Sequence, residues 1–211
     1  KSGKKRAYKP SELKSIFTYC LQEGLREEYN FMRSLLYLGL RRGEMLSIQI
    51  KSISLDDCTI EVLGTKTDNA HRLSILHKEI IPTIKEQIAD KEDNDYLFFD
   101  SEAKLLFDRP LHRDKSDKDK QEIHDYNIGV RINKIIKGVL GSDSKGTLDI
   151  HSIRSNFAQE LYMVKEIKDY DLKLLLGHAR FDITEKHYLV GLKNKEALKA
   201  KVDLADFSAY F

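Results

Sequence analysis

Most of the chain carries apolar residues at the three- and four-residue spacing of amphipathic helices. This spacing predicts helices over about 11–23, 26–38, 78–89, 126–137, 151–163, 169–176 and 194–202, with a short helical turn at 184–189. Glycine follows several of these segments, as is typical of helix ends. Gly24, Gly39 and Gly177 are in such positions. The pattern therefore indicates a mostly helical domain.

Between residues 52 and 76 the period shortens to the alternation of strands. The alternating apolar pairs are Ile53 with Leu55, Ile60 with Val62, and Leu73 with Ile75. Residues 67–70, Thr-Asp-Asn-Ala, provide a turn between the second and third pairs. We expect a small antiparallel sheet here, with Lys66 at a strand end beside the turn, and a further short strand over 96–99.

One stretch of the chain shows neither the helical nor the strand spacing of apolar residues. Residues 114–120 alternate acidic and basic side chains with no apolar residue among them. We expect the surrounding segment, 108–125, to be a mobile loop, since nothing in it would hold it on a core. The expected fold class is thus α+β, mostly helical with one small antiparallel sheet.

Composition agrees with a globular domain. The chain has 211 residues, 41% hydrophobic and 33% charged, which excludes disordered and collagen-like chains. It contains no run of eighteen apolar residues, and its first six residues lack the apolar stretch of a signal peptide, so we expect no membrane span. Its two cysteines form no CxxC motif, which argues against a zinc ribbon or a disulfide scaffold and favours a reducing, cytoplasmic setting.

The net charge identifies no partner. Lysine and arginine number 36 and aspartate and glutamate 34, which gives +2. Both ends are locally basic: residues 1–6 carry four positive charges, and 180–201 carry six against three acids. These ends could face DNA, although a solvated surface explains such charges equally well.

The first candidate motif is Gly39-Leu40-Arg41-Arg42-Gly43-Glu44. Arg41 follows a glycine at a helix start, and its planar, permanently charged guanidinium suits a phosphate. Glu44, three residues later, could hold that guanidinium from behind or cap the helix. The motif is also compatible with an ordinary helix cap carrying two solvated arginines. The Gly-Leu-Arg frame and the spacing to Glu44 favour Arg41 over Arg42.

Two further motifs carry possible proton donors. Lys66 precedes the turn and could swing into a site to donate a proton, or it could be a surface lysine. His151 and Arg154 are three residues apart, so a helix places them on one face, where both can donate to one anionic oxygen. A metal site would instead need a second histidine or a carboxylate there. A histidine at a helix start with a surface arginine explains the pair equally well.

The last motif is Leu175-Leu176-Gly177-His178, followed ten residues later by Tyr188. Gly177 is expected to end a helix and leave His178 at its C-terminal edge. Tyr188 lies on a short amphipathic segment. Most of the ten tyrosines must belong to the core or its rim, and Tyr188 could be one of them.

Together these motifs, in this order, resemble the catalytic domain of the tyrosine recombinases, the phage integrase family. The resemblance covers about Tyr8 to Val190 and implies an integrase-type catalytic domain over 8–190. It also implies that 1–7 is a basic linker stub after an N-terminal DNA-clamping domain that this sequence lacks, as in a fragment. Residues 191–211 would form a C-terminal tail helix. An apolar face of that tail could dock on a neighbouring protomer or pack on its own domain.

The resemblance implies cleavage and rejoining of double-stranded DNA through a covalent 3′-phosphotyrosine, without metal, cofactor or ATP. Tyr188 would be the nucleophile and Lys66 the general acid. Arg41, Arg154 and His178 would stabilise the phosphate, His151 would move the nucleophile's proton, and Glu44 would support the site. The protein would act as a homo-oligomer, a tetramer on DNA, and would be a phage or mobile-element integrase of the cytoplasm.

Other functions share some of these features. A type IB topoisomerase or a telomere-resolving enzyme would use the same residues to relax DNA or to form hairpin ends. A DNA-binding remnant would have lost catalysis, and a helical interaction module would show the motifs by coincidence. A metal-dependent nuclease is disfavoured because no cluster of Asp, Glu and His has ligand spacing.

Overall fold

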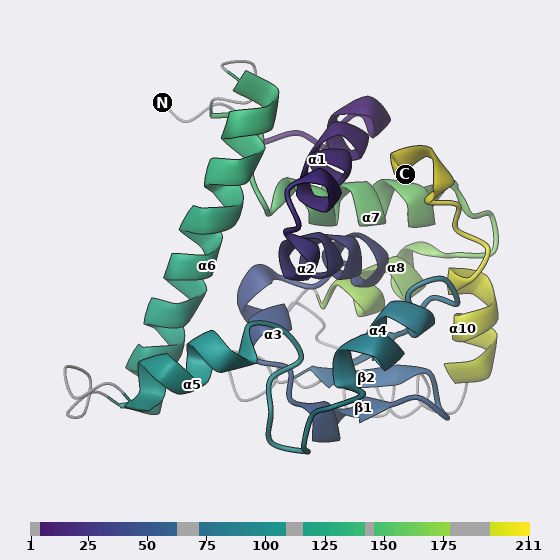
Figure 1. Cartoon of the computed structure of the whole chain (residues 1–211). Helices are drawn as coiled ribbons and strands as arrows, with labels where there is room; N and C mark the ends of the chain where they lie inside the picture. The colour runs from purple at the N-terminus through teal and green to yellow at the C-terminus, as the bar shows by residue number, and fades with distance from the viewer. Residues whose placement is uncertain (1–4, 63–71, 109–115, 142–145, 178–194) are drawn as a thin grey trace.

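The computed structural model describes residues 5–62, 72–108, 116–141, 146–177 and 195–211, and Figure 1 traces their arrangement. The α-helices of this part are α1 (Pro10–Gln22), α2 (Arg26–Leu38), α3 (Arg42–Leu46), α4 (Ile81–Ile88), α5 (Asp100–Asp108), α6 (Asp117–Leu140), α7 (Ser152–Met163), α8 (Asp169–Leu176) and α10 (Lys195–Val202). Two short 3-10 helices, η1 (Ile50–Ser52) and η4 (Ser208–Tyr210), accompany them. The mostly helical α+β fold expected from the sequence is confirmed.

The strands form one antiparallel sheet in the order β1 (Ile53–Ser54), β2 (Thr59–Val62), β3 (Arg72–Ile75). Its register pairs Ile53 with Ile60 and Val62 with Arg72. The sheet lies at one end of the molecule (Figure 1), and β3 contacts both α8 and α10. The predicted sheet is therefore present, and its third strand begins with an arginine that faces the helices.

The helical layer is built on α2, which packs against α1 and α7 and is buried along most of its length. The long helix α6 lies along the outside of α1 (Figure 1). Apolar side chains such as Phe31, Leu35, Ile132 and Phe157 fill the space between these helices. Each buried side chain of this size contributes about 1.5–3 kcal/mol of transfer free energy, so this layer provides a large part of the stability of the domain.

The prediction of a mobile loop over 108–125 was wrong from residue 117 onward, because α6 begins at Asp117. The Ser116 hydroxyl accepts a hydrogen bond from the backbone N–H of Asp119 at 3.2 Å and caps the helix. Acidic residues in the first turn favour this helix end electrostatically. The first turns lack apolar contacts, so periodicity could not reveal them, and the cap together with the buried His124 marks the start of the helix instead.

The expected strand over 96–99 is also absent. The backbone of Tyr96 pairs with Gln49 in an isolated bridge outside any strand, and α5 begins at Asp100. The rings of Phe98 and Phe99 pack edge-on against Phe31 of α2, with centroids 5.5 and 5.2 Å away. The apolar run therefore serves as an aromatic anchor for a turn, and this burial rather than strand pairing explains its composition.

The C-terminal residues pack on their own domain in this single chain. Phe207 is fully buried beside Tyr37, Phe211 stacks on Phe17 at 5.1 Å, and the Tyr210 hydroxyl donates a hydrogen bond to Glu160 at 2.6 Å. Among the other apolar side chains that could form a docking face on the tail, Leu198 and Val202 are buried, whereas Ala197 and Leu204 are exposed. Leu192 lies outside the described residues. Docking of the tail on another protomer stays a prediction.

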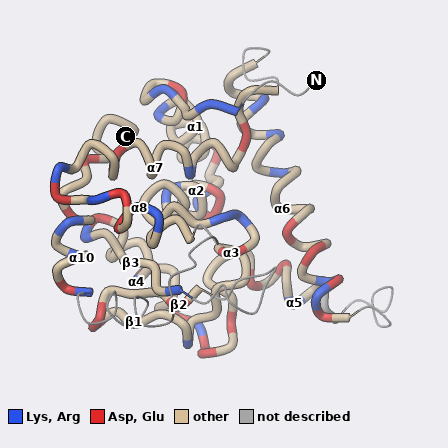
Figure 2. The backbone as a smooth tube through the Cα atoms, turned by 180° about the vertical axis from the view of Figure 1, so that it is seen from behind, with Lys and Arg blue, Asp and Glu red and all other residues tan. Residues whose placement is uncertain are grey.

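Charges of both signs are distributed over the same elements. Figure 2 shows lysine and arginine positions interleaved with aspartate and glutamate along α6 and α10. Along these two helices, positive charge is therefore not separated from negative charge. Within the described ranges, no helix is both long enough and apolar enough to cross a membrane.

Candidate active site

The turn after α2 presents the first candidate arginine. Gly39 ends the helix with φ of +59°, and its N–H donates to the carbonyl of Leu35 at 3.0 Å. A Cβ here would lie 2.1 Å from the ring of Phe157, so both the backbone conformation and the close packing require glycine. The chain then turns into α3 with Arg41 as the residue that precedes the first helical turn.

Glu44 holds Arg41 at two points. One carboxylate oxygen, Oε2, accepts from the backbone N–H of Arg41 at 2.7 Å, and Oε1 accepts from Nη1 of the same residue at 2.7 Å. Both roles considered for Glu44, helix cap and guanidinium partner, are therefore realised. The Glu44 side chain is only 4% exposed, whereas that of Arg41 is 47% exposed. A ligand can thus reach the guanidinium from the solvent side.

A second arginine donates hydrogen bonds to the same carboxylate. Arg72, at the start of β3, donates Nη1 to Oε1 of Glu44 at 3.0 Å and Nη2 to Oε2 at 2.8 Å. This bidentate pair is buried, with side chains 6% and 4% exposed. Sequence reasoning did not select Arg72. In the sequence, Arg72 alternates with apolar Leu73 and Ile75 as Ser74 does, which is the pattern of a solvent-facing strand position.

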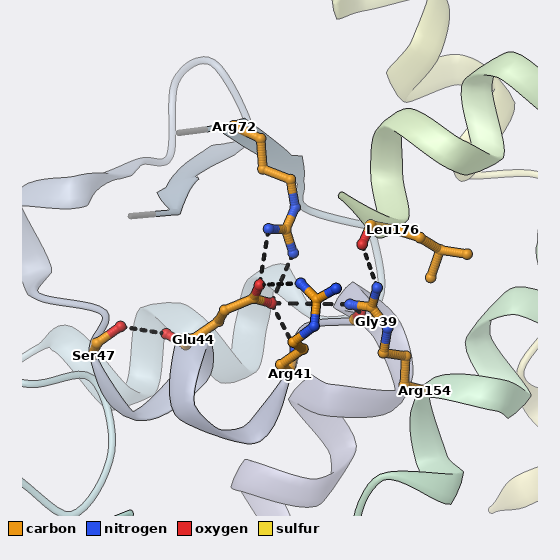
Figure 3. A network of polar contacts seen from close by, with 7 residues as sticks. All are labelled: Gly39, Arg41, Glu44, Ser47, Arg72, Arg154 and Leu176. Atoms are coloured by element: carbon orange, nitrogen blue, oxygen red, sulfur yellow. Dashed lines mark hydrogen bonds and ion pairs between the residues drawn. The ribbon is translucent and has the colours of Figure 1, made fainter. Parts of the chain in front are cut away.

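Arg154 of α7 completes the group. Its Nη1 donates to the Gly39 carbonyl at 2.7 Å, its Nη2 donates to the Leu176 carbonyl at the end of α8, and it lies 3.9 Å from Oε2 of Glu44. Figure 3 shows Arg41, Arg72 and Arg154 arriving from three different elements around Glu44. We refer to these four residues as the Glu44 cluster.

Electrostatics within the cluster favours an added anion. Burial alone would raise the pKa of Glu44, but the hydrogen bonds and charges of Arg72 and Arg41 outweigh it and lower the pKa to about 2. Burial and the positive charge of Arg41 lower the pKa of Arg154 to about 10, although Glu44 opposes this. Three guanidinium groups and one carboxylate leave an excess of two positive charges, partly open to solvent through Arg41.

Arg42, the neighbour of Arg41, points elsewhere. It pairs with Asp125 of α6, with Nη2 3.2 Å from Oδ2 and Nε also bonded to that carboxylate. Its guanidinium lies against Gly129, where a Cβ would meet Nη1 at 2.0 Å. Arg42 therefore ties α3 to α6, and it is Arg41 that belongs to the Glu44 cluster.

His151 precedes α7 and is exposed. Its backbone N–H donates to Oδ1 of Asp149 at 3.0 Å. Partial loss of hydration lowers the pKa of His151; Asp149 opposes this and the charge of Arg42 adds to it. Within the described part of the chain, no hydrogen bond joins its side chain to the Glu44 cluster, so a common site with Arg154 stays a prediction.

Lys66, His178 and Tyr188 lie outside the described residues. Gly177, directly before His178, ends α8 with φ of +59°. A Cβ on Gly177 would come within 2.7 Å of the Arg72 guanidinium. The described chain thus brings the residue before His178 to the Glu44 cluster. In the same part of the chain, no group of three or more His, Cys, Asp or Glu side chains could hold a metal ion.

A comparison with known protein families matches residues 7–195 to the Phage integrase family. The chain therefore belongs to this family, the tyrosine recombinases, and represents its catalytic domain. No curated protein matches the chain in a comparable search.

Several solved structures share the fold. One is a XerA recombinase, with a TM-score of 0.56, 19% identity, and coverage of 99% of this chain and 61% of that one. Another is the Tn1549 transposon integrase in complex with transposon right end DNA, with a TM-score of 0.59, 14% identity, and coverage of 90% and 66%. The same integrase with circular intermediate DNA gives 0.57, 15%, 89% and 66%. This chain thus spans a little under two thirds of the length of these proteins.

Proposed function

We propose that this protein performs site-specific DNA recombination, cutting and rejoining strands through a 3′-phosphotyrosine on Tyr188, as a phage or mobile-element integrase. One observation carries the proposal: Arg41 and Arg154, 113 positions apart in the sequence, converge on one buried carboxylate with an excess of positive charge. Membership of the Phage integrase family supports the same chemistry.

The arginines address the main obstacle to the reaction. A tyrosine hydroxyl with a pKa near ~10 is a weak nucleophile, and the anionic phosphodiester repels it. Guanidinium groups donate bidentate, charge-assisted hydrogen bonds to phosphate oxygens and bind most strongly when negative charge increases in the pentacoordinate transition state. Arg41 and Arg154 would contact the two non-bridging oxygens, assisted by His178.

Proton transfer completes the proposed mechanism. The bond from phosphorus to the tyrosine oxygen forms as the bond to the 5′ oxygen breaks. Lys66 protonates the leaving 5′ oxygen as general acid, and His151 accepts the proton of the Tyr188 hydroxyl. One phosphodiester replaces another, so the bond energy is retained and a 5′ hydroxyl from a partner strand can reverse the step without ATP.

Double-stranded DNA is the proposed substrate, bound by a homo-oligomer, a tetramer on DNA. The solved Tn1549 integrase complexes contain DNA, which supports this substrate for a chain of the same fold. That a DNA-clamping domain outside this sequence strengthens the grip stays a prediction.

A trapping assay tests the proposal. The protein is mixed with a nicked suicide substrate that carries a candidate recombination site, and denaturing electrophoresis then detects a covalent adduct, which peptide mapping should assign to Tyr188. Tyr188→Phe should form no adduct yet bind the DNA nearly as well, because it lacks only the attacking oxygen. A covalent adduct formed by Tyr188→Phe would contradict the assignment of the nucleophile.

The assay also separates the alternatives. Binding without an adduct, in this chain and in a longer version of the protein, would favour a DNA-binding remnant. Relaxation of supercoiled plasmid without exchange between two sites would favour a topoisomerase-like activity. Strand exchange between two labelled sites is the result expected here.

A further inference from the structure

Arg72 has no direct route to a DNA substrate. Its side chain is 6% exposed, and both Nη atoms are engaged with the buried carboxylate of Glu44. A group in this position can influence a bound phosphate only through its neighbours. The neighbours of Arg72 are therefore the key to its role.

The first neighbour is Glu44, which in turn fixes Arg41 by its backbone N–H and by its guanidinium. Each carboxylate oxygen is shared between Arg72 and Arg41, because Oε1 accepts from the side chains of both and Oε2 accepts from Arg72 and the Arg41 backbone. Moving Arg72 would rotate the carboxylate and displace the Arg41 guanidinium with it.

The second neighbour is the end of α8. The Arg72 guanidinium lies so close under Gly177 that a Cβ there would come within 2.7 Å of its Cζ, Nε and Nη1 atoms. The preceding carbonyl, that of Leu176, accepts a hydrogen bond from Arg154. Arg72 thus supports the backbone that fixes one side of the Arg154 guanidinium. Figure 3 shows the hydrogen bond between Leu176 and Arg154.

We propose that Arg72 is a positioning residue for strand cleavage: it sets Arg41 through Glu44 and Arg154 through the end of α8, so that both guanidinium groups meet the scissile phosphate. This rests on the proposed function. It assigns to the third strand of the sheet a part in the reaction that no motif in the sequence indicates.

The test uses single-turnover adduct formation on two suicide substrates, one with an ordinary scissile phosphodiester and one with a methylphosphonate. The methylphosphonate is neutral, so guanidinium charge contributes much less to its cleavage. A residue that positions phosphate-binding arginines should matter on the first substrate and little on the second. A residue that only stabilises the fold should matter equally on both.

Arg72→Lys keeps the positive charge but loses the bidentate geometry. We expect it to slow cleavage of the phosphodiester about 10- to 100-fold, as a displacement near 1 Å does. On the methylphosphonate the rate should lie within about threefold of the unmodified protein, and Arg41→Lys should show the same pattern. The matched control is Arg131→Lys, in a second and more exposed arginine–carboxylate group. This variant should change the cleavage rates of the two substrates by equal factors.

A second variant tests the route through Glu44. Glu44→Gln removes the negative charge of the Arg72–Glu44 pair. Its cleavage rate should therefore depend on the charge of the substrate as that of Arg72→Lys does. The double variant should be no slower than the slower single one, because both changes interrupt one chain of contacts. Glu44→Gln also gives an independent answer if Arg72→Lys does not fold, which a thermal unfolding curve would reveal.

The experiment distinguishes failure of the proposed function from failure of the positioning role of Arg72. Absence of any adduct from the unmodified protein would contradict the proposed function itself. An active unmodified protein whose folded Arg72→Lys variant cleaves both substrates at the normal rate, or both at an equally reduced rate, would overturn the positioning role alone. Additive effects of the two substitutions would overturn the route through Glu44.

Discussion

Two groups of arginine and glutamate side chains in this protein differ in which residue type is in excess. In the Glu44 cluster one carboxylate serves three arginines. In the second group, the Arg131 cluster, one arginine of α6 lies between Glu102 at 2.7 Å and Glu28 at 3.3 Å, with its guanidinium 4.8 Å from the ring centre of Phe99. The first group has surplus positive charge and the second has none.

This difference distinguishes a candidate site from a structural link. Arg131 joins α2, α5 and α6, and its single positive charge is outweighed by the two carboxylates, so no anion is attracted there. The Glu44 cluster also joins distant elements, but its carboxylate can neutralise only one of three guanidinium groups. Arrangements of like charges are costly unless a ligand compensates them, so the surplus is the feature that points to function.

The largest effect expected is on stability, from Glu44→Gln. Removing the buried carboxylate leaves Arg72 and Arg154 without compensation, and losing one partner of a buried pair costs about 3–5 kcal/mol. Glu102→Gln, in the more exposed Arg131 cluster, should cost less than about 1 kcal/mol. Urea unfolding at neutral pH measures both. Equal losses of unfolding free energy in the two variants would contradict the difference proposed between the Glu44 cluster and the Arg131 cluster.

The next effect concerns the rate of covalent adduct formation. Arg154→Ala should lower it about 100- to 1000-fold, the usual loss for one preorganised charge-stabilising donor. Arg131→Ala should leave the rate unchanged once the protein is folded, because its charge is used within the fold. Single-turnover trapping under saturating DNA compares the two. A comparable loss in Arg131→Ala would remove the distinction drawn above.

The acid dependence of stability should also report on the Glu44 cluster. Folding lowers the pKa of Glu44 from 4.5 to about 2, so protonation favours the unfolded chain. The stabilisation is complete above pH 4.5 and is lost as the pH falls toward 2, by about 3 kcal/mol. Urea unfolding at several pH values measures this loss. The free energy of unfolding of Glu44→Gln should depend less on pH over this range than that of the unmodified protein. The remaining slope would come from other acids with lowered pKa, such as Asp149.

The smallest effect is expected from an exposed pair. Arg26 and Glu86 lie 3.0 Å apart with most of both side chains in solvent. Arg26→Ala should change the free energy of unfolding by no more than about 0.5 kcal/mol, since water and salt screen such pairs. Urea unfolding checks this. A loss as large as that of Glu44→Gln would show that burial is not what distinguishes the Glu44 cluster.

Much of the fold could be predicted because apolar spacing carries it. The helices α1, α2, α7 and α8 and the three-stranded sheet follow patterns that burial enforces. The start of α6 was missed because a cap and charges, rather than apolar contacts, define it. The run at 96–99 was misread because a short apolar segment does not reveal whether it pairs as a strand or packs as an anchor.

The site was predictable in part for a similar reason. The spacing of Arg41 and Glu44 is local, so the sequence could indicate their contact, which the structure contains. Arg72 is 28 residues from Glu44, and only the assembled fold places them together. No periodicity distinguishes a buried arginine in a strand from an exposed one. The catalytic roles of all the candidate residues stay predictions, those of Arg41, Arg154 and Glu44 included.

The two carbonyl groups that hold Arg154 have a consequence for how the protein is made. Gly39 precedes Arg154 by 115 residues in the sequence, whereas Leu176 follows Arg154 by 22 residues. A chain that emerges from the ribosome N-terminus first can form the contact between Arg41 and Glu44 early, but Arg154 finds its place only when α8 has been synthesised and folded. An incomplete chain therefore lacks a contact that holds Arg154 in the Glu44 cluster. A protein proposed to break DNA would thus gain that capacity only as its last elements fold.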